Sequence, residues 1–337
     1  MRILIVTDAW RPQVNGVVRT LETLAEALQD FDVEVEFLTP DGFPSLPLPS
    51  YPEIRLAMAT SAQIARRIDA VAPDAIHIAT EGPLGFMARR FCLARGRAFT
   101  TSYHTKFPEL VHARTPMPES WTYRLLRRFH NAGQGMLVAT PSLGRELSAL
   151  GFKNIRPWTR GVDTQHFNPD RRKDLGLPGP IFLCVGRLAV EKNLPAFLDL
   201  DLPGSKVIVG DGPEFANLKN RYPDVHFLGT KTGDELAEIY ASADVFVFPS
   251  RTDTFGNVLL EALASGCPIV GFPVTGPLDI VGDGIGGVLS EDLREAALGA
   301  LEVSRSVARE KALTYNWSEC AAQFLQHLQP AEQNIAA

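Results

Sequence analysis

Short apolar, β-branched runs alternate with helix-like segments along almost the whole chain, and this alternation restricts the fold most strongly. In the first half, strands are expected at residues 2–7, 33–38, 75–78, 98–102 and 136–140. In the second half, they are expected at residues 180–186, 206–210, 225–228, 244–248 and 267–271. Strand–helix alternation of this kind predicts parallel sheets that are covered by helices on both faces.

The alternation is interrupted once, at NPDRRKDLGLPGP (168–180), whose proline, glycine and charge content is typical of an interdomain linker. A chain of 337 residues is also long for a single core. We therefore expect an α/β protein made of two doubly wound, Rossmann-like domains that face a cleft. Ligands of such sheets lie outside the carboxyl ends of the strands.

The composition, 45% apolar and 21% charged, is that of an ordinary soluble globular protein. Four widely spaced cysteines form no CxxC pair, so neither a disulfide framework nor a zinc site is expected. The start, MRILIVTDAW, fits a buried strand better than a signal peptide. No run approaches the roughly 20 apolar residues that a membrane span requires.

The net charge of −6 conceals a basic region. Residues 86–160 contain 13 lysines and arginines against 3 acidic residues. Such a region suits a phosphate, an anionic membrane surface or a nucleic acid. A nucleic acid is disfavoured, because the whole chain is acidic and carries no nucleic-acid motif.

Two carboxylates flank a glycine in DTFGNVLLE (253–261), where a helix is expected to begin near Gly256. The unpaired amides of a helix start suit phosphate oxygens, and a glycine lets the backbone approach a ligand. Glu261 would accept hydrogen bonds from vicinal hydroxyls such as those of a ribose, and Asp253 from hydroxyls at the other end of a nucleotide ligand. The alternative is that Asp253 caps the helix and Glu261 is a solvated helix residue.

Two further loops follow strands of the second half. In VGRLAVEKN (185–193), Arg187 and Lys192 would neutralise a diphosphate without a metal, although a pair of surface cations is the alternative. In VIVGDGP (207–213), Gly210 and Asp211 lie in a turn that predicts another close backbone approach. This turn fails as a dinucleotide fingerprint, because Phe215 occupies the third glycine position.

The first half offers two candidate positions after strands. Gly16, in PQVNGVVRT (12–20), would admit a phosphate or sugar, or belong to a plain tight turn. His104, in TSYHTKFPE (101–109), is the histidine best placed to face the cleft, with a structural role as the alternative. A DxD sequence, Asp199 to Asp201, would suit a divalent ion but is expected in a surface turn.

In combination, NGV, SYHT, GRLAVEKN, GDGP and D-x7-E resemble the GT-B fold retaining glycosyltransferases of family 4, over nearly the whole chain. Details such as PQVNGVVRT, FLDLDLPGSK and PVTGP are most similar to the bacterial branch that glycosylates lipids, which includes sulfolipid synthase-like and α-mannosyltransferase-like enzymes. The resemblance implies an acceptor-binding domain at 1–170 and a nucleotide-sugar-binding domain at 171–312. A last helix, at 313–330, would cross back to the first domain.

The resemblance also implies roles for individual residues. Arg187 and Lys192 would hold the donor diphosphate and stabilise the leaving group, and Glu261 would bind the ribose. Asp253 stands where the family has a glutamate near the donor sugar hydroxyls, and its side chain is shorter by one methylene. The backbone amides of Asn257 and Val258 would donate to phosphate oxygens. Gly16 would line the diphosphate and acceptor side of the site, and His104 would contact the donor sugar. No cofactor or metal is expected.

The segment PESWTYRLLRRFHNAG contains a predicted helix at 119–131 whose Arg124, Arg127 and Arg128 share one face, while Trp121, Leu125 and Phe129 share another. A basic and aromatic amphipathic helix can lie on an anionic bilayer. A core-packed helix with solvated arginines is the alternative.

The resemblance, together with these residues, implies a metal-independent, retaining hexosyltransferase that uses a UDP- or GDP-sugar. Its acceptor would be a membrane lipid such as diacylglycerol, and it would be cytoplasmic and peripheral on the inner face of the plasma membrane. The alternatives are a transferase acting on a soluble or polysaccharide-precursor acceptor, a nucleotide-sugar epimerase, an NAD-dependent oxidoreductase, and a non-catalytic nucleotide-sugar binding protein.

Overall fold

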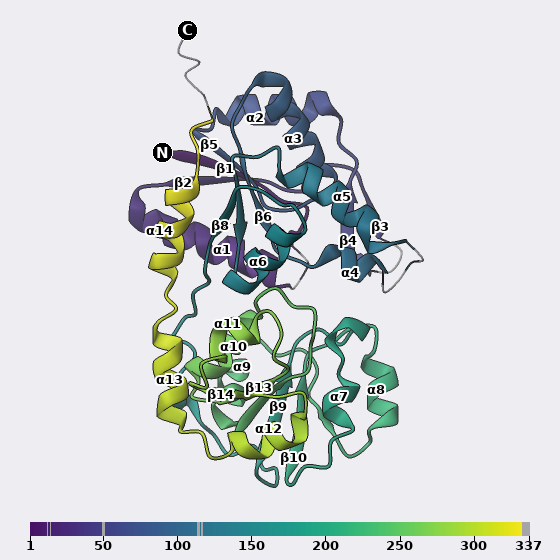
Figure 1. Ribbon diagram of the computed structural model, residues 1–337, viewed down its shortest axis with the longest axis vertical. Coiled ribbons are helices and arrows are strands. Elements are labelled where there is room, and N and C mark those ends of the chain that lie inside the picture. The colour runs from purple at the N-terminus through teal and green to yellow at the C-terminus, as the bar shows by residue number, and fades with distance from the viewer. Residues whose placement is uncertain (12, 14, 49–50, 113–114, 116, 332–337) are drawn as a thin grey trace. The chain divides into compact units, whose positions relative to one another are not determined.

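The computed structural model describes residues 1–331 apart from 12, 14, 49–50, 113–114 and 116, and it divides the chain into two compact units (Figure 1). Unit 1 comprises Met1–Arg160 and Trp317–Ala337, and unit 2 comprises Gly161–Asn316. The first boundary thus lies ten residues before the expected division at residue 170. The reason is that residues 162–167 bond within unit 2: the Val162 amide donates to the Tyr315 carbonyl at 3.2 Å, and Arg309 donates to the carbonyls of Thr164 and Phe167.

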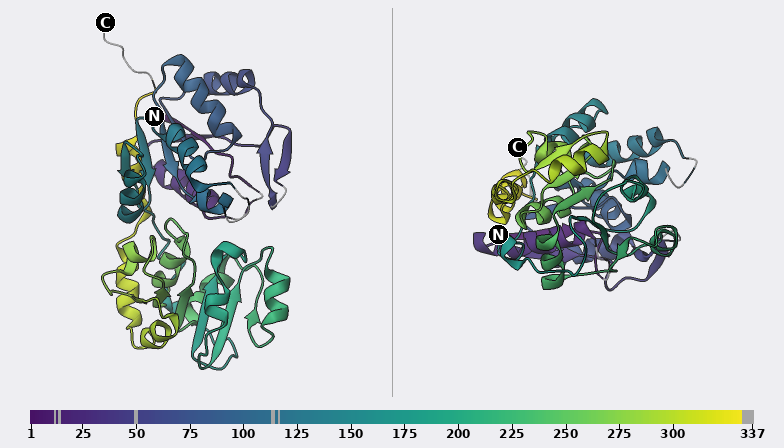
Figure 2. Two further views of the ribbon diagram at one scale, coloured as in Figure 1. Left: turned by 45° about the vertical axis from the view of Figure 1, so that its right-hand side comes forward. Right: turned by 90° about the horizontal axis from the view of Figure 1, so that it is seen from below.

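Within the described residues, unit 1 contains a six-stranded parallel sheet with the order β2-β1-β5-β6-β7-β8. Its strands are β1 (Arg2–Val6), β2 (Glu34–Leu38), β5 (Ala75–Ile78), β6 (Thr100–Tyr103), β7 (Gly135–Val138) and β8 (Ile155–Pro157). A separate antiparallel hairpin, β3 (Ser45–Leu48) and β4 (Tyr51–Ala57), stands at the side of unit 1 (Figure 2). The helices are α1 (Gly16–Leu28), α2 (Ser61–Val71), α3 (Pro83–Arg95), α4 (Phe107–His112), α5 (Glu119–His130), α6 (Pro141–Ala149) and α14 (Trp317–His327).

Strand β1 shows how the unit 1 core forms, because its alternate residues enter opposite faces of the sheet. Leu4 and Val6 join a cluster with residues of α2 and α3, whereas Ile3 and Ile5 join a cluster with residues of α1 and α14. The helices start where the sequence supplies caps: the Asn15 side chain accepts from the amides of Val17 and Val18 at the start of α1. The sheet is therefore covered on both faces, and the last helix of the chain forms part of one cover.

Unit 2 repeats this plan with a six-stranded parallel sheet of order β11-β10-β9-β12-β13-β14 within the described residues. Its strands are β9 (Ile181–Val185), β10 (Ser205–Val209), β11 (His226–Phe227), β12 (Val245–Phe248), β13 (Ile269–Gly271) and β14 (Gly287–Leu289). The helices are α7 (Pro195–Leu198), α8 (Phe215–Arg221), α9 (Gly233–Ser242), α10 (Asn257–Ala264), α11 (Pro277–Val281), α12 (Leu293–Ala300) and α13 (Arg305–Leu313). Residues of α7, α8 and α12 pack on one face of the sheet, and on the other the Tyr240 ring of α9 lies 5.7 Å from that of Phe246.

The expected fold class, two doubly wound parallel-sheet domains, is confirmed. The sequence did not predict the hairpin β3–β4, nor the edge strands β8 and β14, each of which has three residues. The four cysteines, Cys92, Cys184, Cys267 and Cys320, are buried and unbridged.

Candidate functional site

The unit 2 sheet has a switch point between its two central strands, β9 and β12, which pair in parallel. From β9 the chain proceeds outward through β10 and β11, and from β12 it proceeds to the opposite side through β13 and β14. Open α/β sheets bind their ligands at this point, outside the carboxyl ends of the strands. The loop after β9 carries Arg187 and Lys192, and the loop after β12 carries Asp253 and Gly256, so four predicted site residues follow these two strands.

The side chains of Lys192 and Asp253 form an ion pair at this edge. The Lys192 Nζ donates to the Asp253 Oδ1 at 2.7 Å and to the Oδ2 at 2.9 Å, and both side chains are more than two-thirds buried. Asn193 fixes the end of the lysine loop, since its Nδ2 donates to the Pro249 carbonyl at 3.1 Å and its φ is +52°. The interpretation of Asp253 as a helix cap is wrong, because Gly256 occupies the N-cap of α10.

Helix α10 begins with Asn257 and Val258, and its cap residue has no side chain to occupy the first amides. Gly256 has a φ of +88°, and a Cβ there would lie 3.1 Å from both Phe248 Cζ and Leu259 Cδ1. Both the backbone conformation and the packing thus require glycine. The first turn of α10 therefore begins at a glycine, in the loop that also carries Asp253.

Glu261 is buried one turn into α10, with 4% of its surface exposed. Its Oε2 accepts a hydrogen bond of 3.0 Å from the Tyr240 hydroxyl of α9. The alternative of a solvated helix residue is therefore wrong. A carboxylate has several acceptor positions, so this side chain is of a kind that can also accept from ligand hydroxyls.

Glycines tie the loops at this edge to one another. Gly210 has a φ of +137°, and a Cβ there would lie 1.9 Å from the Gly186 carbonyl oxygen. The Gly210 amide donates to the Gly229 carbonyl at 2.8 Å, and the Leu188 amide donates to the Asp211 carbonyl at 2.9 Å. The close approach predicted at Gly210 is thus made by the protein's own backbone, and Asp211 is exposed beside it.

The acidic pair Asp199 and Asp201 lies in the surface turn that was expected, between α7 and β10. The Asp199 Oδ1 accepts from the Tyr222 hydroxyl at 2.6 Å. Because this turn precedes β10, it lies at the amino end of that strand, on the edge of the sheet opposite Arg187.

In unit 1, the predicted residues Gly16 and His104 also follow strands, but neither of the two strands is the partner of the other in the sheet. The switch point lies between β1 and β5. Gly16 begins α1 after β1, in a motif of which residues 12 and 14 are outside the described part of the chain. His104 follows β6, and its Nδ1 lies 3.3 Å from the Arg160 Nη2. Burial, followed by the charge of Arg160, lowers the pKa of His104 well below its usual range, so the imidazole is neutral.

The switch point of unit 1 is occupied by an acidic residue that the sequence did not single out. Asp8 is buried, and its carboxylate accepts from the amides of Leu84 and Gly85, at 2.9 and 3.2 Å, at the start of α3. Burial raises the pKa of Asp8 to about 6 and outweighs these hydrogen bonds, which lower it.

In the basic helix α5, the residues that share a face are not the ones that were predicted. Phe129 is buried in the core with 1% exposed, so it does not share an outer face with Trp121 and Leu125. Those two side chains are 67% and 51% exposed, and the exposed Arg124 and Arg128 alternate with them at helical spacing. Arg127 is instead half-buried and donates to the Leu150 carbonyl at 2.8 Å. Trp121, Arg124, Leu125 and Arg128 thus form one exposed stripe, called the α5 stripe below.

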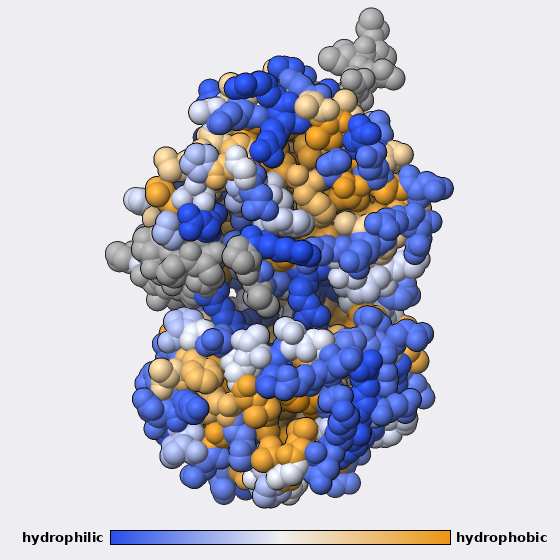
Figure 3. All heavy atoms as spheres, turned by 180° about the vertical axis from the view of Figure 1, so that it is seen from behind, coloured by the Kyte–Doolittle hydropathy of each residue, from blue (hydrophilic) through white to orange (hydrophobic). Residues whose placement is uncertain are grey.

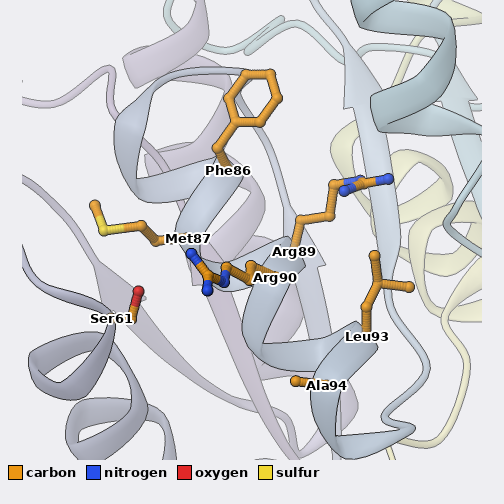
Figure 4. A pocket seen from close by; sticks show the side chains of 7 residues that line it. All are labelled: Ser61, Phe86, Met87, Arg89, Arg90, Leu93 and Ala94. Carbon is orange, nitrogen blue, oxygen red and sulfur yellow. The ribbon is translucent and has the colours of Figure 1, made fainter.

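A surface pocket elsewhere in unit 1 contains none of the predicted residues. It is lined by Ser61, Phe86, Met87, Arg89, Arg90, Leu93 and Ala94, and Figure 4 shows Met87 and Arg90 extending from α3 toward Ser61 of α2. On the face of the molecule drawn in Figure 3, apolar areas are bordered by hydrophilic side chains. No helix in the described ranges combines the length and apolar composition that crossing a bilayer requires.

Besides Asp8, two residues at these sites were missed in the sequence. Tyr240 holds Glu261 from a different helix, 21 positions away, and Arg160 contacts His104 across 56 positions. No local motif connects either pair, so their proximity follows from the folded chain.

Comparison with known proteins agrees with this geometry. Residues 14–166 match the model of "Glycosyltransferase Family 4", and residues 179–304 match that of "Glycosyl transferases group 1". A GDP-mannose-dependent alpha-mannosyltransferase of Corynebacterium glutamicum is 32% identical over 97% of this chain and 88% of its own length. An alpha-monoglucosyldiacylglycerol synthase of Streptococcus pneumoniae is 27% identical over 89% of this chain and 78% of its own length.

Among solved structures, the sucrose-phosphate synthase of Thermosynechococcus elongatus matches with a TM-score of 0.79. The two sequences are 20% identical, and the match covers 96% of this chain and 97% of the other. At this identity the likeness supports the fold alone. The two family matches, the mannosyltransferase identity and the paired parallel sheets agree: the chain is a glycosyltransferase of family 4 with the GT-B fold.

Proposed function

We propose that this glycosyltransferase moves a hexose from a UDP- or GDP-sugar to a membrane lipid hydroxyl, such as that of diacylglycerol, with retention of the anomeric configuration. The observation that carries the donor half of the proposal is the set of groups after β9 and β12. A lysine, two carboxylates and the start of α10 lie at the switch point of the unit 2 sheet. This combination suits a ligand that has phosphates and hydroxyls.

The proposed donor complex assigns a role to each group. Arg187 and Lys192 offset the diphosphate charge without a metal ion, and the amides of Asn257 and Val258 donate to phosphate oxygens. Glu261 accepts from the ribose hydroxyls. Asp253 accepts from hydroxyls of the sugar and shares the Lys192 ammonium with the phosphate. His104 contacts the sugar from unit 1, Gly16 lines the diphosphate and acceptor side, and Gly210 and Asp211 shape the donor loop.

In the proposed reaction, the acceptor hydroxyl attacks the anomeric carbon on the face that the phosphate leaves. The bond between the anomeric carbon and the phosphate oxygen breaks, and the new glycosidic bond forms. The proton of the acceptor hydroxyl moves to the departing phosphate oxygen. Negative charge accumulates on the nucleoside diphosphate, where Lys192 and Arg187 stabilise it electrostatically.

The lipid acceptor is proposed from two observations. The names of two relatives refer to mannosyl transfer from GDP-mannose and to synthesis of glucosyldiacylglycerol. In addition, the α5 stripe places two arginines beside an exposed tryptophan and leucine. Such a surface suits an anionic bilayer, and we propose that the enzyme is peripheral on the cytoplasmic face of the plasma membrane.

The test is product analysis with UDP- and GDP-hexoses, with and without diacylglycerol vesicles, in buffer containing EDTA. We expect a hexosyl lipid whose anomeric coupling, measured by NMR, matches that of the donor. An inverted anomer would overturn retention, loss of product in EDTA would overturn metal independence, and a product formed only on soluble acceptors would overturn the lipid assignment.

A further inference from the structure

Arg160 is a buried cation at the end of unit 1, with 4% of its surface exposed. Its Nη1 donates to the carbonyls of Trp158 and Thr159, at 2.9 and 3.0 Å, and its guanidinium lies over the Trp158 ring at 4.1 Å. No carboxylate in the described part of the chain forms an ion pair with it. Burying a charge without an opposite charge is costly, which suggests a specific role for the guanidinium.

The third contact of Arg160 determines the chemistry of His104. The Arg160 Nη2 lies 3.3 Å from the His104 Nδ1. A guanidinium has N–H donors and no acceptor, so the imidazole must accept through an unprotonated Nδ1. A neutral histidine that accepts through Nδ1 carries its proton on Nε2.

We propose that Arg160 is a positioning residue that holds His104 as the neutral Nε2–H tautomer, so that His104 meets the donor sugar as a hydrogen-bond donor. The part that concerns the sugar rests on the proposed function. The tautomer itself rests on the geometry of unit 1.

The surroundings of His104 keep the ring in place and uncharged. Its ring lies 5.8 Å from that of Trp158, edge to face, and the Trp158 Nε1 donates to the Cys320 carbonyl at 3.1 Å. Besides Arg160, the titratable groups that act on His104 are His77 and His130. His77 is neutral, because burial lowers its pKa to about 3, and His130 bonds to Thr101 and Glu81. Burial, then the charge of Arg160, and these two histidines lower the pKa of His104, so the ring does not become an imidazolium at neutral pH.

In this tautomer, His104 does not act as a general base. Since Nε2 carries the proton, its lone pair is not available to take a proton from the acceptor. What the reaction needs at position 104 is therefore a fixed N–H, and a glutamine at this position should supply much of it.

The test measures the tautomer directly in the free, full-length enzyme. Protein labelled with ¹⁵N-histidine is examined by two-bond ¹H–¹⁵N correlation, and the His104 signals are assigned by their loss in His104→Gln. We expect an unprotonated Nδ1 and a protonated Nε2 in the unmodified enzyme. A proton on Nδ1 in the unmodified enzyme overturns the proposal, and this readout requires no variant at Arg160.

Variants at position 160 then test the cause. Arg160→Met should produce a mixture of tautomers at His104, whereas Arg160→Lys, which retains a charged donor, should preserve the Nε2–H form. The matched control is Arg89→Met, because Arg89 also donates to two unit 1 carbonyls, of Arg128 and Phe129, without contacting His104. An unchanged His104 spectrum in folded Arg160→Met would overturn the role of Arg160.

A double-mutant cycle connects the tautomer to catalysis. Arg160→Met should raise the KM for the donor sugar nucleotide about tenfold, the effect of losing one hydrogen bond, while kcat changes little. In the His104→Ala background, which removes both the acceptor for Arg160 and the N–H, the same substitution should have no further effect. A full tenfold effect in that background would overturn the coupling. If the enzyme transfers no sugar at all, the proposed function fails while the NMR result still decides the tautomer.

Discussion

The Lys192 ammonium lies 2.7 and 2.9 Å from the two carboxylate oxygens of Asp253, and the two residues follow the two central strands of the unit 2 sheet. The pair couples a residue assigned to the diphosphate with one assigned to the sugar. A ligand at this edge would therefore meet a cation whose position is already fixed, so little reorganisation is needed when charge develops in the transition state.

Replacing Lys192 by methionine should reduce kcat about a hundredfold, since one preorganised cation at the leaving group is removed. Arg187→Ala should act in the same direction. The measurement is steady-state transfer from the sugar nucleotide that the product analysis identifies as the donor, with Lys219→Met on α8 as the control for a surface lysine of unit 2. Undiminished turnover in Lys192→Met or Arg187→Ala would contradict the electrostatic role of that residue.

Glu261→Gln should raise the KM for the donor about tenfold with a smaller change in kcat, because the ribose contact is made in both the ground state and the transition state. Tyr240→Phe, which removes the 3.0 Å hydrogen bond to Glu261, should have a weaker effect in the same direction. Isothermal titration with the nucleoside diphosphate measures the affinity. The exposed Glu310→Gln is the control, and equal affinities for all three variants would exclude a ribose role.

Gly210→Ala should destabilise unit 2 by about 3 kcal/mol, because the added Cβ would meet the Gly186 carbonyl oxygen at 1.9 Å and the φ is +137°. Gly299→Ala is the matched control. Gly299 lies in α12 with open space around its Cβ position, so alanine should stabilise the protein by about 0.5–1 kcal/mol. Urea unfolding of both variants measures the difference, and similar stabilities would show that the loop relaxes around a methyl group.

Asp8 predicts a pH dependence of stability. Its folded pKa, about 6, lies above the ordinary value of 3.8, so the folded state binds the proton more tightly than the unfolded state does. The stability that this group contributes is therefore present at low pH and is lost as the pH rises from about 4 to above 6. Urea midpoints of the unmodified protein and Asp8→Asn, compared from pH 4 to 7, should show the unmodified protein losing stability relative to the variant. A relative gain over this range would mean that the hydrogen bonds to Leu84 and Gly85 outweigh burial.

The α5 stripe predicts binding to anionic vesicles. Replacing both Arg124 and Arg128 by glutamine should weaken the partition onto phosphatidylserine-containing vesicles by about 2 kcal/mol, or roughly thirtyfold, since each basic residue near the surface contributes about 1 kcal/mol. The double variant Arg66→Gln and Arg95→Gln removes the same amount of charge from α2 and α3 of unit 1. It serves as the control in the cosedimentation measurement. Equal losses in both double variants would indicate a general charge effect.

The sequence predicted the parts of the fold and site that depend on local order. Because parallel strands end at a shared edge, the loops after β9 and β12 could be assigned to one site from their positions alone. The partners of those residues could not be predicted in this way. Lys192 meets Asp253 across 61 positions, and the role of Asp253 as a cap was an equally good local interpretation.

The errors have physical causes of the same kind. Phe129 has the spacing to share a face with Trp121, but α5 buries the side that carries Phe129 and Leu126 and exposes the side that carries Trp121. Helical periodicity identifies faces, and packing decides which face is covered. Arg160 was overlooked because a single arginine after a three-residue strand has no pattern that distinguishes it from a surface cation.

Helix α14 makes the order of synthesis matter for this chain. Cys320, Ala321 and Phe324 complete the apolar cluster that Leu21 and Leu24 of α1 begin, and a ribosome makes all of unit 2 before it reaches them. Unit 2 is contiguous, so it can fold on a nascent chain while that side of unit 1 is still uncovered. Unit 1 is therefore complete only after unit 2 has been synthesised, and a stop codon shortly after residue 316 would leave α1 without its partner on that face even though the whole sheet of unit 1 is present.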